Sequence, residues 1–171
     1  MSPSFIVDTW RIWEWLITIA FRIGLRNQYQ VIPQATTPWG EKKTNGTRSP
    51  INVFPDVAVY SLSNSSEPVF LVDAKYKNLD NERANDVERD DLYEAFAFCH
   101  ATGAKQLFLA YPSSVSHLSE AGSITNVSNY VIDGKTISAI KVAFGTITKQ
   151  GDITAFCRKL SSEIMTAVKM E

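Results

Sequence analysis

The passage from residue 68 to residue 112 constrains the fold of this chain more than any other stretch. Two apolar runs, at 68–76 and 105–112, have the length and composition of strands. Between them, residues 88–103 carry apolar side chains at a helical spacing, and Gly103 stands where a helix commonly ends. A strand, a helix and a strand in this order predict a right-handed crossover between parallel strands. We therefore expect an α/β domain with helices packed on a mixed sheet.

The remaining elements surround this unit in one domain that spans residues 1–171. Helical periods predict the first and last helices, Pro33 favours an edge strand, and Asp133-Gly134 between β-branched runs predicts a hairpin. Asp152 is expected to cap the last helix. The expected order is a helix at 5–25, a strand at 28–34, a loop or wide hairpin at 36–50, strands at 51–61 and 68–76, a helix at 88–103, a strand at 105–112, a hairpin at 129–145 and a helix at 153–168.

Composition and charge place the chain in a broad class. It has 171 residues, 44% of them apolar, and its formal net charge of −1 gives no overall basic signal for nucleic acid. Cys99 and Cys157 are the only cysteines, and their wide spacing fits neither a zinc knuckle nor a disulfide framework. The apolar stretch at 15–21 is far shorter than the ~20 residues that a membrane span needs, and the N-terminus has no signal-peptide pattern. We expect a cytoplasmic protein that does not cross a membrane.

Charged residues stand at unusual places in the strands 51–61 and 68–76. Asp56 lies at the head of the first strand, and Asp73 and Lys75 lie near the end of the second. If a hairpin joins the strands, the two acids are neighbours, and Asp73 and Lys75 point to the same face. Close carboxylates are costly unless a divalent cation neutralises them, and oxygen ligands suit Mg²⁺ or Mn²⁺. The alternative interpretation is ordinary Pro-Asp turn chemistry and a cross-strand ion pair.

Glu14 is a further candidate, on the first helix. It lies beside Trp13, on or next to the face that should pack on the sheet. Proximity to the same metal would explain a carboxylate in this place. A glutamate at the rim, paired with Arg11 or Arg22, explains it equally well.

The joint pattern carries a family resemblance. Pro55-Asp56 followed by Asp73-Ala74-Lys75 resembles the P-D…(D/E)-x-K signature of the PD-(D/E)XK, or restriction-endonuclease-like, nucleases, whose core is helix, three strands, helix, strand. Within that superfamily the chain is most similar to the McrC-type nuclease subunit of modification-dependent restriction systems. The matching pieces are Trp13-Glu14, "PDV", "LVDAKYKN" and "RDDLYEAFAF" followed by "LFLAYP", so the resemblance covers residues 10–112.

This resemblance implies metal-assisted hydrolysis of DNA phosphodiester bonds by a restriction or phage-defence endonuclease. Asp56 and Asp73 would be metal ligands together with the Ala74 carbonyl, for Mg²⁺ or, as a substitute, Mn²⁺. Lys75 would position or activate the attacking water as a charged group, since lysine titrates near pH ~10.4. Glu14 would hold the metal directly or through water.

The helix after the Asp-x-Lys strand departs from the family pattern. Family members usually carry Gln where Glu94 stands and Tyr where Phe98 stands. Glu94 is therefore either a further acid near the metal or a helix-surface residue, and Tyr93 is a second candidate for an accessory role. The alternative functions are a Holliday-junction resolvase or an exonuclease of the same fold, and a catalytically inactive DNA-binding or assembly module.

Basic residues and the resemblance together predict partners. Lys42, Lys43 and Arg48 lie in the segment before Asp56 and could grip phosphates without reading bases, and Lys77 is a further candidate for a DNA contact. The resemblance implies DNA as the substrate and a GTPase or ATPase motor subunit as a partner. A homodimer is also expected, because single-chain nucleases that cut both strands usually pair two active sites.

Overall fold

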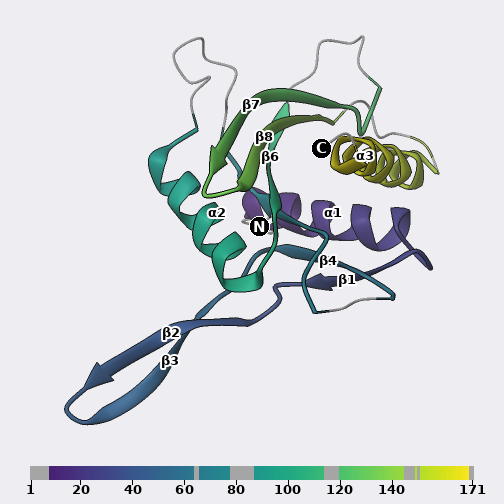
Figure 1. Ribbon diagram of the computed structural model, residues 1–171. Helices are drawn as coiled ribbons and strands as arrows, with labels where there is room; N and C mark the ends of the chain where they lie inside the picture. Colours follow the sequence, from purple (N-terminus) through teal and green to yellow (C-terminus); the bar gives the residue numbers. More distant parts are fainter. Residues whose placement is uncertain are drawn as a thin grey trace, which may run out of the picture.

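The computed structural model describes residues 8–63, 66–77, 87–113, 120–144, 149 and 151–169. At its centre is a six-stranded sheet (Figure 1). In spatial order its strands are β1 (Tyr29–Pro33), β4 (Val57–Ser61), β5 (Phe70–Ala74), β6 (Gln106–Ser113), β8 (Lys135–Ala143) and β7 (Ile124–Ile132). The pairs β5–β6 and β6–β8 are parallel and the other neighbours are antiparallel. The mixed sheet and the helical crossover between β5 and β6 are confirmed.

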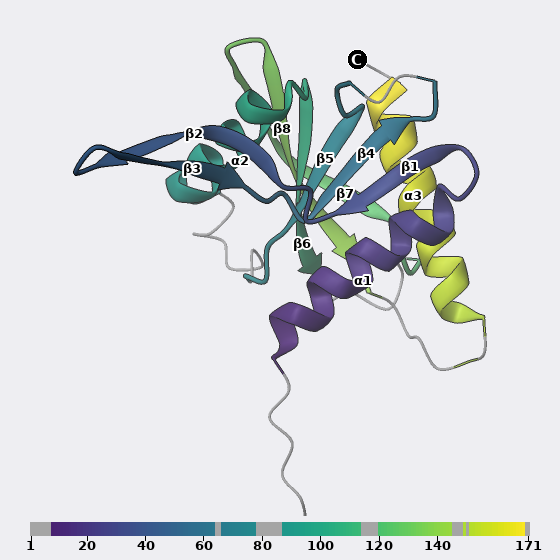
Figure 2. The same ribbon diagram turned by 90° about the horizontal axis from the view of Figure 1, so that it is seen from below.

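Helices cover both faces of this sheet (Figures 1 and 2). Those in the described part of the chain are α1 (Thr9–Gly24), α2 (Arg89–Thr102) and α3 (Asp152–Lys169). The helices α1 and α3 pack side by side over one face, and α2 covers the other. None of these described helices is long and apolar enough to span a membrane.

The central strands are apolar on both faces because helices bury both. In β4 and β5, Val57 and Val72 belong to the core beneath α1 and α3, whereas Ala58 and Leu71 belong to the core beneath α2. Side chains alternate along a strand, so Asp73 lies on the same side as Leu71 and faces α2. The α2 side of the sheet is therefore where the candidate site must be sought.

The strand expected at 51–61 is in fact two strands in different sheets. Residues up to Val53 belong to β3 (Thr47–Val53), which among the described strands pairs with β2 (Thr37–Thr44) alone to form a separate two-stranded ribbon. Pro55 has no backbone N–H to give to a ladder, and β4 begins after it, at Val57. Of the two structures expected for residues 36–50, a loop or a wide hairpin, the hairpin is therefore confirmed. It projects from the body of the molecule (Figure 2).

The C-terminal hairpin is confirmed but is longer than its sequence pattern indicates. Its first strand, β7, begins at Ile124 rather than at residue 129. A bulge between Asn126 and Ser128 shifts the register, which conceals the two-residue alternation of a strand at this point.

A substitution at Gly24 tests the contact between α1 and α3. A Cβ there would lie 2.8 Å from the Cys157 carbonyl oxygen and would overlap the Ser161 side chain. We expect Gly24→Ala to lower the free energy of unfolding by about 1–3 kcal/mol, although alanine favours helix. The matched control is Gly40→Ala, since nothing lies within 4 Å of its added Cβ. Chemical denaturation of both variants is the measurement, and a Gly24→Ala protein as stable as wild type would contradict the tight packing.

Candidate active site

Asp56 and Asp73 are brought together by the pairing of β4 with β5. Val57 pairs with Val72 in this antiparallel ladder, so the next residue on each side, Asp56 and Asp73, stand opposite one another. The Ala74 amide donates a hydrogen bond of 2.8 Å to Asp56 Oδ2. The two acids therefore occupy neighbouring places at the end of the sheet, where a hairpin between their strands predicts them.

The two carboxyl groups share a poorly solvated place and are in hydrogen-bonding contact. Burial and then the charge of Asp73 raise the pKa of Asp56 to about 8. Burial also raises the pKa of Asp73, which is 5% exposed, against the lowering effect of the Lys75 charge. At neutral pH and without metal, the pair therefore keeps a proton between its two carboxyl groups.

Lys75 follows the strand and is surrounded by carboxylates. Its Nζ lies 2.7 Å from Asp73 Oδ2, 2.6 Å from Glu94 Oε2 and 3.8 Å from Asp91 Oδ1. Burial lowers the pKa of Lys75, but the charge and close contact of Asp73 and the hydrogen bond to Glu94 outweigh this effect, so the pKa lies above its usual range. The side chain is therefore a fixed ammonium group and not a free base. Glu94 takes part in the site through this ion pair.

The acid pair fits a hard divalent cation. Asp73 Oδ2 is buried and receives no aligned hydrogen bond, even though Lys75 Nζ is close to it. A cation would replace the proton that the two carboxyl groups otherwise keep. Within the described ranges, no group of three or more His, Cys, Asp and Glu side chains could hold a metal ion. The protein would therefore supply two carboxylates, leaving coordination positions for backbone oxygen, water and substrate, as Mg²⁺ prefers.

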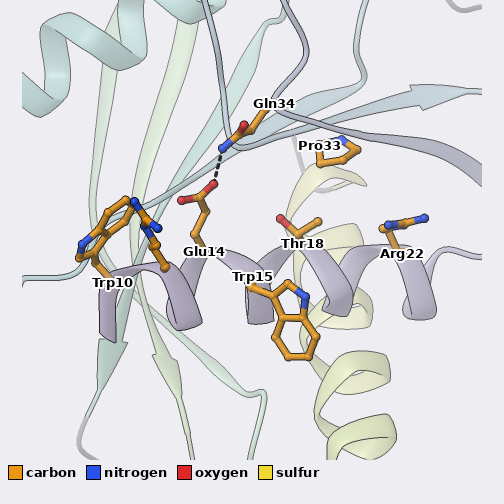
Figure 3. A pocket seen from close by; sticks show the side chains of 8 residues that line it. Trp10, Glu14, Trp15, Thr18, Arg22, Pro33 and Gln34 are labelled. Carbon is orange, nitrogen blue, oxygen red and sulfur yellow. Dashed lines mark hydrogen bonds between the residues drawn. The ribbon is translucent and has the colours of Figure 1, made fainter. Parts of the chain in front are cut away.

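Glu14 is held by Gln34, beside an open groove of about 590 Å³ between α1 and the end of β1 (Figure 3). Gln34 Nε2 donates a hydrogen bond of 2.5 Å to Glu14 Oε1. The backbone N–H of Gln34 donates one of 2.9 Å to the Asp56 carbonyl. The structure therefore places Glu14 next to the acid pair but does not gather it into a three-carboxylate group. Among the described residues it forms no ion pair with Arg11 or Arg22, which was the alternative interpretation; Arg11 pairs with Asp8 at 3.5 Å.

Trp13 ties the first helix to the strand ends that carry the site. Its indole Nε1 donates a hydrogen bond of 3.0 Å to the Ala110 carbonyl of β6, in a buried position. The Lys75 amide donates a hydrogen bond of 2.9 Å to the same carbonyl. The Ala110 carbonyl thus holds both Trp13, the neighbour of Glu14, and the backbone of Lys75 in place.

Asp91 and Tyr111 belong to the site but were missed by sequence reasoning. Asp91 is a buried acid of α2, and Tyr111 Oη donates a hydrogen bond of 3.2 Å to its Oδ2. Burial and then the charge of Asp91 raise the pKa of Tyr111, so the phenol remains a donor. An acid in the first turn of a helix is usually a solvated residue, and an aromatic residue in an apolar strand is usually core, so neither residue gave a distinct signal.

The residues predicted to contact DNA lie in two different settings. Lys77 contacts Glu88 at 2.6 Å and Asp91 at 3.1 Å, so acids of α2 already neutralise it. Lys42, Lys43 and Arg48 are exposed on the projecting ribbon, where Arg48 lies 3.4 Å from Glu41. Tyr93, the second accessory candidate, is 68% exposed on α2 and is not among the groups around Lys75.

Comparison with known proteins adds a family and a structural neighbour. The family model described as "McrBC 5-methylcytosine restriction system component" matches residues 1–112. A solved structure of Thermococcus gammatolerans McrB AAA+ hexamers with bound McrC contains a chain of similar fold. The TM-score is 0.56 at 16% sequence identity, over 93% of this chain and 34% of that chain. No curated protein matches. This chain therefore spans about a third of its structural neighbour.

The pH dependence of stability tests the shared proton. An acid whose pKa rises on folding binds more protons in the folded state. Its contribution to the free energy of unfolding is therefore present at low pH and is lost as the pH rises from the unfolded pKa of 3.8 through the folded pKa of about 8. Asp56→Asn keeps a side-chain oxygen for the Ala74 amide and does not titrate. Without metal, we expect this variant to be more stable than wild type by on the order of a few kcal/mol above that window, with a smaller difference at acid pH.

The measurement is chemical denaturation in EDTA across this pH range. Asp90→Asn, which removes an exposed acid of α2, is the matched control and should follow wild type. A constant difference between Asp56→Asn and wild type at every pH would show that Asp56 is an ordinary solvated carboxylate.

Proposed function

Because this chain belongs to the McrBC 5-methylcytosine restriction system component family, we propose that it is the cleavage module of such a system, a metal-dependent endonuclease that hydrolyses DNA phosphodiester bonds. The observation that carries the proposal is the convergence of Asp56, Asp73 and Lys75 at one sheet end. A buried acid pair that keeps a proton, next to a lysine that remains charged, is costly for a structural site. It is well suited to a site that binds a cation and a phosphate.

Each residue has a role that follows from its position. Asp56 and Asp73 would hold Mg²⁺ or Mn²⁺, which would supply Lewis-acid stabilisation of the phosphate charge. The N–H and C=O of an extended residue point to the same side, so the Ala74 carbonyl is directed to Asp56, as its amide is. Lys75 would hold the attacking water or stabilise charge on the phosphate, and Glu94 and Asp91 would keep its ammonium in place. Glu14 would contact the metal through water, positioned by Gln34.

The family and the structural neighbour also support an assembly. The neighbour is McrC bound to McrB AAA+ hexamers, and we extend this to the present chain as a partner class: a nucleotide-driven AAA+ motor that delivers DNA. Cleavage of both strands would further require two copies of the site, as in a homodimer.

Cleavage of a closed circular plasmid tests the proposed chemistry. We expect wild type to nick the circle in Mn²⁺ or Mg²⁺ and not in EDTA, because an endonuclease needs no DNA end. Asp73→Asn and Lys75→Ala should each lower the rate at least about 100-fold, since each removes charge stabilisation from the reaction. Circular dichroism should remain native.

Asp90→Asn and Lys105→Ala remove the same charges from exposed positions and are the matched controls. Cleavage of linear DNA alone would indicate an exonuclease. A wild-type protein that leaves both substrates intact in Mn²⁺ would contradict the proposed catalysis, and a near-normal rate for either site variant would contradict the assigned residues.

A further inference from the structure

The ribbon of β2 and β3 extends well beyond what the core of the domain needs. Every residue from Pro38 to Ile51 is exposed, and only its base, at Val53, is buried. Both ribbon faces are therefore in solvent, as Figures 1 and 2 show for its projection from the body. A two-stranded hairpin is at best marginally stable by itself, so the outer part of the ribbon, which has no core face, is a candidate surface for a ligand.

The charge of the ribbon is opposite to that of the rest of the chain. It holds three of the chain's 17 Lys and Arg residues but only one of its 18 Asp and Glu residues. Lys43 pairs directly with Arg48 across the ribbon, and like charges opposite one another destabilise a hairpin. Glu41 offsets this only in part, at 3.4 Å from Arg48. A polyanion between or beside these side chains would remove the repulsion.

The shape of the ribbon fits a groove. Asn45 and Gly46 have φ values of 50° and 80°, the signature of a tight two-residue turn, so the tip is no wider than two strands. The major groove of B-DNA, about 12 Å wide, admits a two-stranded β-ribbon. The eight residues of β2, at roughly 3.3 Å each, extend on the order of 26 Å, or about seven to eight base-pair steps.

The base of the ribbon lies at the candidate active site. The backbone N–H of Gln34 donates a hydrogen bond of 2.9 Å to the Asp56 carbonyl, so a residue three positions before the ribbon is joined to the first acid after it. Only Phe54 and Pro55 separate the last ribbon residue from Asp56. A duplex whose phosphate lies at the acid pair is therefore within reach of the ribbon.

We infer that the β2–β3 ribbon enters the major groove of duplex DNA on one side of the scissile phosphate. Lys42, Lys43 and Arg48 lie along the groove walls, and Arg48 is the residue best suited to the O6 and N7 acceptors of a guanine. This inference deepens the proposed function and rests on it for the position of the scissile phosphate. The sequence predicted that these basic residues contact phosphates without reading bases, whereas a ribbon in the major groove would also contact base edges.

The experiment combines affinity with groove-specific footprinting on a linear duplex carrying guanines on both strands. Binding is measured in EDTA and in Ca²⁺, which separates it from cleavage. The Lys42→Ala, Lys43→Ala, Arg48→Ala triple variant should bind more weakly, and the slope of log affinity against log salt should fall by about 0.9 for each lost phosphate contact. Wild type should protect guanine N7, a major-groove atom, from methylation in one block, and the triple variant should lose that protection.

The matched control carries Arg26→Ala, Lys105→Ala and Arg158→Ala, which remove the same charge from exposed positions outside the ribbon. It should keep the footprint. Unchanged DNA binding by the ribbon variant, or a wild-type complex that leaves guanine N7 reactive, would overturn the inference and would direct the ribbon to a protein partner. Ribbon-dependent N7 protection by a protein that never cleaves would sustain the groove contact and contradict the proposed nuclease instead.

Discussion

The carbonyl oxygen of Ala110 is the point on which the arrangement of the site depends. It lies in β6, where β5 ends, and it accepts hydrogen bonds from the Trp13 indole and from the Lys75 amide. The first bond fixes α1 on the sheet, and the second keeps the chain in register for one residue past β5. A buried N–H group that lost this acceptor would be left unpaired, so the helix and the strand end are held by the same requirement.

The charged groups of the site work against the stability of the fold that carries them. Asp56 and Asp73 are side by side in a poorly solvated place, and Lys75 is shared among Asp73, Glu94 and Asp91. A protein that used this sheet end only for structure would be more stable with apolar residues there. The arrangement is reasonable for a protein that gains a cation, because a cation carries the positive charge that the carboxylates lack and would in turn attract a phosphate.

The sequence predicted the parts of this structure that local periodicity controls. The positions of Asp56 and Asp73 followed from an antiparallel pair of strands, and the common face of Asp73 and Lys75 followed from their separation by two residues. The family resemblance added roles that no spacing could supply. The class of the sheet and its crossover were likewise accessible, because strand, helix and strand patterns fall in one continuous passage.

The features that sequence reasoning missed depend on tertiary contacts. Asp91 becomes buried only because α2 lies over the end of the sheet, and Gln34 becomes relevant only because β1 ends next to Asp56. The break between β3 and β4 was hidden for a similar reason: residues 51–61 read as one strand, and only their partners assign them to two sheets. Local patterns carry no information about which partner a strand selects.

The hydrogen bond between Gln34 and Asp56 links the base of the ribbon to the candidate acid pair. Only Phe54 and Pro55 connect the ribbon to Asp56, and Pro55 fixes one backbone torsion there. Few torsions can therefore absorb a rotation of the ribbon relative to the sheet. Torque applied at the tip would then reach the Asp56 carboxyl group and the Gln34 that holds Glu14. Under the proposed function, the shape of the DNA bound at the ribbon would thereby influence how the groups at the acid pair are aligned.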